Sequence, residues 1–340
     1  MVPLVPHRDL VVVGASAGGV EALRTLAASL PESFPAALAV VLHVSPYGGS
    51  ALPAILSRAG PLPARHVEHG EAVKPGQVYI APPDFHLIVH DGHFALSRGP
   101  RENGHRPAAD VLFRTAARSL GSRVVGVVLS GALDDGTAGL AAIRERGGVT
   151  VVQDPAEATY PAMPASAKAH VPVDHVVTTK EMASLLVRLC TEEVEATAPN
   201  ASSLLRKEAA VAAFDNGEPG PEPAGSPAGF SCPDCNGVLY EIRAGDLFRY
   251  RCRVGHAWSA ESLLAQQSLA LESALWMALR SLEEKAELSR QLAERASARG
   301  SKLSGDRFRS AADEAMHAAA LLREMLESGA GFAPTGPHAS

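Results

Sequence analysis

The stretch over residues 11–20, Val-Val-Val-Gly-Ala-Ser-Ala-Gly-Gly-Val, constrains the fold more than any other part of the chain. An apolar, strand-like run breaks into small residues around Ser16 and then continues with a helical pattern. Small residues allow a sharp turn, and the following helix would direct its unpaired N–H groups and positive dipole end toward whatever lies over the serine. The pattern predicts an anion or oxyanion pocket, with Ser16 either as a nucleophile or as part of a phosphate-binding turn.

Residues 10–190 alternate short Val/Ile/Leu runs with Ala-rich segments of helical period. This alternation is typical of an α/β fold with a doubly wound, mostly parallel, Rossmann-like sheet. Strands are expected at 10–13, 37–42, 76–80, 124–129 and 149–153, and helices at 19–29, 50–58, 110–120, 136–146 and 180–189. Residues 87–89 and 93–96, joined at His90-Asp91-Gly92, predict an antiparallel hairpin insert in which His86, His90 and His93 are solvated.

The composition changes beyond this segment, and the chain is expected to have five parts. These are an α/β domain over 1–190, a flexible linker over 191–229, a zinc-ribbon-like module over 230–258, a C-terminal α-helical hairpin over 259–328 and a disordered tail over 329–340. Ser259 is expected to cap the first helix of the hairpin. The hairpin would bury two apolar stripes, namely Leu264, Leu271, Leu275 and Leu282 against Phe308, Ala312, Ala319 and Leu322. Trp276 and Met277 belong either to this core or to a docking face.

Charge and hydropathy exclude several classes of function. The chain has 31 Lys and Arg residues against 37 Asp and Glu residues, and a net charge of -6 produces no field that would gather nucleic acid. Its apolar runs are far shorter than the roughly 20 residues of a membrane-spanning helix. Residues 1–9 lack the features of a secretory leader. We therefore expect a cytoplasmic protein that neither binds nucleic acid nor inserts into a membrane.

Candidate catalytic side chains follow three of the predicted strands. Ser16 follows the first strand, His43 follows the second, and the pair Asp134-Asp135 comes shortly after the strand at 124–129. The carboxyl ends of parallel strands meet at one edge of a sheet, so these residues are expected to converge as a Ser-His-Asp triad. Spacing alone does not say which of the two aspartates is the partner of His43.

Six segments of residues 9–190 resemble, in order, motifs of the bacterial chemotaxis receptor methylesterase (CheB) family. They are Gly-Ala-Ser-Ala-Gly-Gly at 14–19, Leu-His-Val-Ser-Pro at 42–46, Val-Tyr-Ile-Ala-Pro-Pro at 78–83, His-Arg-Pro at 105–107 with Asp-Val-Leu-Phe at 110–113, Ser-Gly-Ala-Leu-Asp-Asp-Gly-Thr-Ala-Gly at 130–139, and Tyr-Pro-Ala-Met-Pro at 160–164. The resemblance implies a serine esterase that hydrolyses protein glutamyl methyl esters, releases methanol and in some members deamidates glutamines. No cofactor is expected for this catalysis.

The resemblance also implies a role for each residue of the triad. Ser16 would be the nucleophile, His43 the general base and Asp135 its orienting partner, while Asp134 would stabilise the loop. The expected protein partner is a methylated chemoreceptor or another signalling protein.

Further residues are candidates for binding the substrate. The N–H groups of Ala17 and Gly18 would stabilise the oxyanion, and Met163 lies in the motif at 160–164. Arg106 is either a substrate-binding group or part of a structural ion pair. Ala17 stands where the family frequently has a hydroxyl residue and Ala132 where it typically has a methionine, differences that bear on substrate or rate rather than on the reaction class.

The resemblance leaves regulation and substrate open. Family members usually carry an N-terminal receiver domain, so regulation is expected to come from elsewhere, for example from a partner that binds the C-terminal helices. One alternative function is a non-catalytic signalling adaptor that binds a receptor segment, against which the intact Ser16, His43 and Asp135 argue. Another is an esterase or amidase that acts on a substrate outside chemotaxis.

Three of the four cysteines have the spacing of metal ligands. Cys232 and Cys235 form a Cys-x2-Cys pair, and after sixteen intervening residues Cys252 and His256 form a Cys-x3-His pair. This spacing suits one tetrahedral, structural zinc ion, with a redox Cys-x-x-Cys as the alternative. Cys190 stands apart and is expected to be a small apolar filler.

Overall fold

Strand β1 (Leu10–Ala15) lies at the centre of a seven-stranded sheet whose order is β3-β4-β2-β1-β7-β8-β9. The computed structural model describes residues 6–195, 201–213, 225–244 and 247–328. All pairings in this sheet are parallel, and every residue of β1 and β2 is buried. The other strands are β2 (Ala37–Leu42), β3 (Ala64–His66), β4 (Val78–Ile80), β7 (Val124–Val128), β8 (Val149–Gln153) and β9 (His175–Val177). Burial on both faces explains why the central strands read as unbroken apolar runs.

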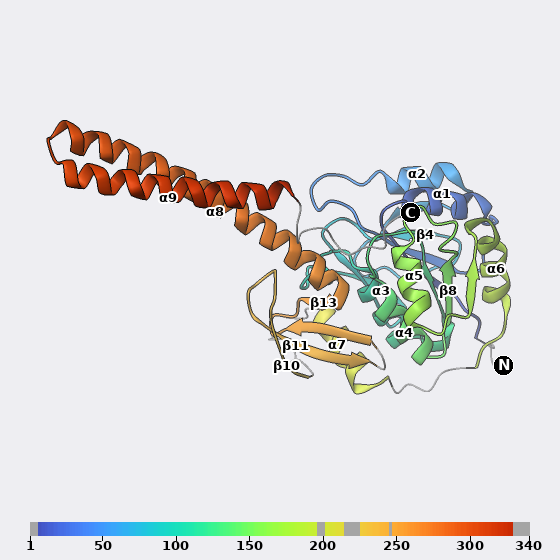
Figure 1. The fold of residues 1–340 in the computed structure, drawn as a ribbon. Coiled ribbons are helices and arrows are strands. Elements are labelled where there is room, and N and C mark those ends of the chain that lie inside the picture. The colour runs from blue at the N-terminus through green and yellow to red at the C-terminus, as the bar shows by residue number, and fades with distance from the viewer. Residues whose placement is uncertain (1–5, 196–200, 214–224, 245–246, 329–340) are drawn as a thin grey trace. The chain divides into compact units, whose positions relative to one another are not determined.

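Helices cover both faces of this sheet, which confirms the predicted doubly wound α/β fold (Figure 1). Helices α1 (Gly19–Ser29), α2 (Leu52–Ala59) and α6 (Thr179–Thr191) pack on one face, where Leu26, Leu56 and Leu186 meet β1 and β2. The other face is covered by α3 (Ala109–Leu120), α4 (Thr137–Glu145) and α5 (Ala162–His170), and the short 3-10 helix η1 (Gly121–Arg123) leads from α3 into β7. The predicted boundaries of the shared elements agree with these to within a few residues.

The antiparallel hairpin is confirmed as β5 (His86–His90) and β6 (His93–Ser97), which form a separate two-stranded sheet. The prediction that its histidines are solvated is wrong for His86, which is fully buried. Its Nε2 lies 2.9 Å from the carbonyl oxygen of Pro100, so a hydrogen bond replaces the water that the ring loses. His90 and His93 are exposed.

A second, antiparallel sheet with the order β10-β11-β12-β13 carries the cysteine-rich segment. Its strands are β10 (Ser226–Ser231), β11 (Val238–Ala244), β12 (Leu247–Cys252) and β13 (Ala257–Ser259). The linker expected over 191–229 contains helix α7 (Ser203–Ala213), so the prediction of a flexible segment is wrong there. Leu205 and Ala209 of this helix are buried, and apolar residues at helical spacing outweigh the loop-like composition around them. Residues 196–200 and 214–224 of the predicted linker, and the predicted disordered tail at 329–340, lie outside the described residues.

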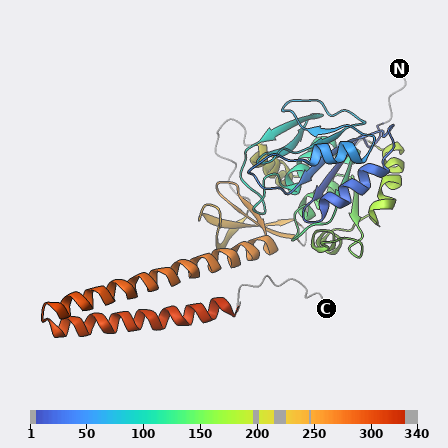
Figure 2. The same cartoon turned by 90° about the horizontal axis from the view of Figure 1, so that it is seen from above.

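The chain divides into two compact units, Met1–Ser262 and Leu263–Ser340. The second unit contains most of α8 (Ala260–Ala298) together with α9 (Lys302–Glu327), which lie antiparallel and side by side (Figures 1 and 2). Within the described residues, no helix combines the length and the apolar character that crossing a bilayer requires.

The buried face of α8 differs from the predicted leucine stripe. Leu264 and Leu271 are exposed, and Leu275 and Leu282 are half-buried. The side chains that α8 buries include Leu279, Ala286 and Ala293. Helix α9 has 26 residues and α8 has 39, so α9 can cover only part of its partner, and alanines let the two backbones approach closely. The predicted stripe of α9 is confirmed, because Ala312 and Ala319 are buried and Phe308 and Leu322 are half-buried. Trp276 and Met277 are exposed, which excludes them from the core of the hairpin.

Candidate active site

Ser16 lies in the turn between β1 and α1, at the carboxyl edge of the parallel sheet. Its N–H donates to the carbonyl of Ser130 at 3.0 Å, and its own carbonyl accepts from the N–H of Gly19 at 2.9 Å. Gly18 has a φ of 70°, a conformation that glycine adopts without strain, and it is the N-cap of α1. The N–H groups of Ala17 and Gly18 donate no hydrogen bond within the described residues. Both groups are therefore available to a developing oxyanion.

His43 lies beside Ser16 because the strands that precede the two residues are paired in register. Ala15 is opposite Leu42 in the ladder, and the N–H of His43 donates to the carbonyl of Ala15 at 3.1 Å. The Nδ1 atom of His43 is buried and has no hydrogen-bond partner in the part of the chain that the structure describes, so no bond joins it to Ser16. Hydrogen bonds between nucleophile and base are often long in free enzymes and tighten when substrate binds.

Asp135 occupies the other side of the imidazole ring. Its Oδ2 lies 2.8 Å from His43 Nε2 and also accepts from the N–H of Ala109 at 2.6 Å, while Oδ1 accepts from the N–H of Asp110 at 3.2 Å and from Asn103 Nδ2 at 3.1 Å. Burial would raise the pKa of Asp135, but the hydrogen bond with His43 and the amide at the start of α3 outweigh burial and lower the pKa to about 2. The carboxylate is therefore ionised at neutral pH and fixed by four donors.

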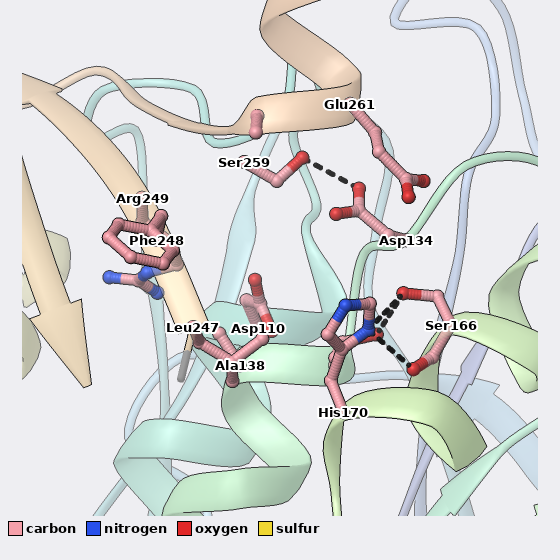
Figure 3. Close-up of a pocket in the computed structure, with 12 residues that line it drawn as sticks. Asp110, Asp134, Ala138, Ser166, His170, Leu247, Phe248, Arg249, Ser259 and Glu261 are labelled. Atoms are coloured by element: carbon pink, nitrogen blue, oxygen red, sulfur yellow. Dashed lines mark hydrogen bonds between the residues drawn. The ribbon is translucent and has the colours of Figure 1, made fainter. Parts of the chain in front are cut away.

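Asp134 points to a different set of partners (Figure 3). Its Oδ1 accepts hydrogen bonds from Ser259 Oγ at 2.7 Å and from Ser262 Oγ at 3.0 Å, at the beginning of α8. The N–H of Ser262 in turn donates to Ser259 Oγ at 3.0 Å, which is the predicted N-cap. Burial raises the pKa of Asp134 to about 6, and the charge of Glu261 adds to this rise. The aspartate that contacts His43 is thus Asp135.

His105 is a neighbour of the site that the sequence did not single out. Its ring stacks on that of His43, with centroids 3.7 Å apart and an interplanar angle of 14°. Burial, together with the nearby His43, lowers the pKa of His105 to about 4, so this ring is neutral above about pH 5. The sequence placed His105 in the His-Arg-Pro motif, but no pattern in the sequence indicates that its ring stacks on the ring of His43.

Arg106 forms an ion pair with Asp84. Its Nε and Nη2 donate to Asp84 Oδ1 at 3.0 and 2.6 Å, and its Nη1 donates to the carbonyls of Arg98 and Gly99 at 3.0 and 2.8 Å. These bonds occupy most of the donors of the guanidinium group. They support the structural alternative for this residue.

Met163 is fully buried at the start of α5, close to the nucleophile turn. Its N–H donates to the carbonyl of Gly131 at 3.0 Å. A Cβ placed on Gly131 would lie 1.9 Å from Met163 Sδ and 2.9 Å from Ser16 Cβ. Gly131 therefore lies between the two side chains, and only a glycine permits their close approach.

A cavity of about 130 Å³ lies beside Asp134 (Figure 3). Its lining comes from α3, α4, α5, β12, β13 and the start of α8, and includes Asp110, Ser166, His170, Phe248, Ser259 and Glu261. Ser16, His43 and Asp135 do not line it. The cavity is a gap between the second sheet and the α/β domain, separate from the place where the predicted triad converges.

The four predicted metal ligands lie together. The ligand atoms of Cys232, Cys235, Cys252 and His256 are all within 4.8 Å of one another. Cys235 Sγ and Cys252 Sγ are 3.6 Å apart, as are Cys252 Sγ and His256 Nδ1. Zinc bonds of about 2.3 Å to sulfur and 2.0 Å to nitrogen, arranged tetrahedrally, require ligand separations of roughly 3.5–3.8 Å. The donor set and its spacing fit one zinc ion.

Cys190 is remote from this cluster, on α6. It is buried, and burial raises the pKa of its thiol to about 12. Such a thiol is inert at neutral pH, in agreement with the role of an apolar filler.

Comparisons with known proteins place the similarity on the domain that carries Ser16, His43 and Asp135. A family model described as CheB methylesterase matches residues 11–186. The chain is 38% identical over 188 residues to a protein of Leptospira interrogans provisionally named protein-glutamate methylesterase/protein-glutamine glutaminase, covering 55% of this chain and 97% of the relative.

Two further similarities agree with this. The chain is 40% identical over 163 residues to the protein-glutamate methylesterase FrzG of Myxococcus xanthus, covering 48% of this chain and 49% of the relative, so it spans about half the length of that protein. The crystal structure of the Thermotoga maritima CheB methylesterase catalytic domain matches with a TM-score of 0.51 and 34% identity, covering 53% of this chain and 98% of that domain.

Proposed function

The chain belongs to the CheB methylesterase family, and from this premise we propose that it is a serine esterase which hydrolyses protein glutamyl methyl esters and releases methanol. The observation that carries the proposal is the 2.8 Å contact between His43 Nε2 and Asp135 Oδ2, made at the sheet edge where Ser16 follows β1. A buried, ionised carboxylate on one ring nitrogen fixes the tautomer, so that the other nitrogen carries the lone pair that can accept a proton.

In the first half of the reaction, Ser16 is the nucleophile. With the Nε2–H of His43 donated to Asp135, Nδ1 is the nitrogen that accepts the Ser16 proton. Ser16 Oγ forms a bond to the ester carbonyl carbon, and the oxyanion is held by the N–H groups of Ala17 and Gly18. The C–O bond to the methoxy group then breaks, and His43 returns the proton so that methanol leaves.

In the second half, water releases the acyl-enzyme. His43 takes a proton from water as the oxygen attacks the Ser16 ester, and the proton returns to Ser16 Oγ as that bond breaks. The sum is one ester and one water converted to one methanol and one carboxylic acid, which ionises at neutral pH to a carboxylate and a proton released to solvent. A glutamine side chain would follow the same path with ammonia as the leaving group, which accords with the glutaminase in the names of the relatives.

We infer that the substrate is a methylated chemoreceptor or another signalling protein. Incubation of the full chain with membranes that carry a methylated receptor should release methanol, and ammonia where glutamines occupy the methylation positions. Hydrolysis of small methyl esters without release from receptors would instead favour an esterase acting outside chemotaxis. Absence of hydrolysis from both would favour the adaptor.

We also infer that the second sheet holds one structural zinc ion on Cys232, Cys235, Cys252 and His256. Four protein ligands close a tetrahedral site and leave no position for a reacting water, so the metal would order the two ligand turns rather than take part in hydrolysis. Cysteines spaced as metal ligands and not joined in disulfides are typical of reducing compartments, in accord with a cytoplasmic location.

A further inference from the structure

Residues 102–105 form a tight turn between the predicted triad and the cysteine-containing sheet. The N–H of Glu102 donates to the carbonyl of His105 at 3.2 Å, and the N–H of His105 donates to the carbonyl of Glu102 at 2.9 Å. The central residues Asn103 and Gly104 have φ angles of 52° and 76°, the type I′ geometry for which Asn-Gly is the preferred pair. The turn therefore has a defined shape.

One side of this turn contacts Asp135 and His43, the proposed partners of Ser16 in the triad. Asn103 Nδ2 donates to Asp135 Oδ1 at 3.1 Å. The ring of His105 covers the face of the His43 ring at a centroid distance of 3.7 Å. The turn thus supplies one of the four donors to Asp135 and covers one face of the His43 ring.

The other side of the turn is bonded to β13, which begins directly after the metal ligand His256. The N–H of Asn103 donates to the carbonyl of Ala257 at 2.8 Å, and Asn103 Oδ1 accepts from the N–H of Ser259 at 2.8 Å. A Cβ on Gly104 would lie 3.5 Å from the buried ring of Trp258. Asn103 therefore bonds to Asp135 and β13 with one side chain.

Buried ion pairs fix the same turn to β12. Glu102 accepts from Arg114 of α3 at 2.6 and 2.7 Å and from Arg251 at 2.9 Å. Arg251 immediately precedes the metal ligand Cys252, and it also donates to the carbonyl of Gly255 at 2.6 Å and to Glu208 of α7 at 3.0 Å. All four charged side chains are buried, and a buried ion pair that loses one partner is strongly destabilised.

We propose that the cysteine-containing sheet positions residues of the active site, an inference that rests on the esterase function proposed above. With its metal bound, β13 clamps the turn at residues 102–105, and the turn holds Asp135 and His43 in their places for proton transfer. Asn103 is the positioning residue of this relay. Cys252 ends β12 and His256 immediately precedes β13, so metal ligation orders the turn that leads into β13, and loss of the metal loosens the clamp.

The test compares Asn103→Ala, Cys235→Ser and the double variant in the full chain. The first readout is the amide hydrogen exchange of Ala109 and Asp110, whose N–H groups donate to Asp135. The second is the rate at which a fluorophosphonate modifies Ser16, and the third is the zinc content. The matched control is Cys190→Ala, which alters a buried thiol outside the cluster and should leave all three readouts unchanged.

We expect Asn103→Ala to keep its zinc, to exchange both amides faster and to lose roughly 10- to 100-fold in the modification rate, as for a misplaced catalytic group. Cys235→Ser should lose its zinc and should also show faster amide exchange and slower modification of Ser16. The double variant should exchange no faster, and be modified no more slowly, than the more severe single variant. Because Cys235→Ser can impair folding, the wild type is also stripped with a chelator and reloaded with zinc. Reloading with zinc should restore the amide exchange and the modification rate of the wild type. Removal of zinc from Asn103→Ala should change these two rates little.

The relay is contradicted if removal of zinc from the wild type leaves the amide exchange and the modification rate unchanged. It is also contradicted if the reductions in modification rate of the two single variants add in the double variant. Ser16→Ala that is modified as fast as the wild type would instead contradict the esterase mechanism. In that case the hydrogen exchange of Ala109 and Asp110 still decides whether metal binding holds Asp135.

Discussion

Asp134 and Asp135 are adjacent in the chain, but their carboxylates bond to different parts of the molecule. Asp135 Oδ2 lies 2.8 Å from His43 Nε2, whereas Asp134 Oδ1 lies 2.7 Å from Ser259 Oγ at the start of α8. The loop after β7 thus presents one carboxylate to the imidazole and the other to the start of α8. This division separates two residues that the sequence pattern could not tell apart.

Exchange of each aspartate for asparagine should separate their roles. Asp135→Asn should lower kcat by about 10³- to 10⁴-fold, because an amide no longer fixes the His43 tautomer. Asp134→Asn should lower kcat by less than about tenfold, since its oxygen can still accept from Ser259 and Ser262. Methanol release under saturating substrate measures both, and the opposite ranking would transfer the triad role to Asp134.

The raised pKa of Asp134 predicts a pH-dependent stability. Burial raises this pKa from the ordinary 3.8 to about 6, so the folded state favours the protonated form. The contribution of the protonated Asp134 carboxyl to the free energy of unfolding is complete below pH 3.8 and is lost as the pH rises through about 6. The unfolding free energy of the wild type should therefore fall by about 3 kcal/mol relative to Asp134→Asn across this window. Urea unfolding of both proteins at several pH values checks this, and a constant difference would contradict it.

Gly131 should tolerate no side chain. In Gly131→Ala the new methyl group would meet Met163 Sδ and Ser16 Cβ, so we expect a loss of about 1–3 kcal/mol in stability and a lower kcat. Gly49→Ala is the matched control, because nothing lies within 4 Å of a Cβ at that position. Thermal unfolding and methanol release measure the two effects. Equal behaviour of the two variants would show that Gly131 does not restrict the space around Ser16.

The cysteine cluster should contain about one zinc ion per chain. Elemental analysis of the purified protein should find it, and Cys232→Ser should reduce the content strongly because a ligand is lost. Cys190→Ala should retain the metal, since Cys190 lies outside the cluster. A folded wild-type protein that holds no metal after zinc is supplied would exclude the structural site.

The central part of the fold and the positions of Ser16 and His43 were predictable from local pattern. Strands β1 and β2 are continuous apolar runs because both faces of the sheet are covered, and each run ends in a reactive residue at the same edge. Strands β3 and β9 have only three residues each, too few for a periodic signal. Helix α5 begins at Ala162, inside the segment that was recognised only by its Met-Pro motif.

Long-range contacts account for what the sequence could not reveal. Asn103 and His105 belong to a loop, and their roles depend on β13, which lies more than 150 residues later in the chain. The stripe predicted for α8 assumed a partner along the whole helix, whereas α9 is shorter. His86 was predicted to be solvated because it adjoins the hairpin, but it is buried and its Nε2 forms a hydrogen bond with the distant carbonyl of Pro100.

The most direct test of the account is methanol release from membranes with a methylated receptor by the wild type and by Ser16→Ala. The account predicts that the wild type releases methanol and that Ser16→Ala is slower by at least about 10³-fold, because the acyl-enzyme cannot form. Both proteins should show the same zinc content and unfolding temperature, so that the loss reports on chemistry alone. Equal methanol release by the two proteins would contradict the assignment of Ser16 as the nucleophile.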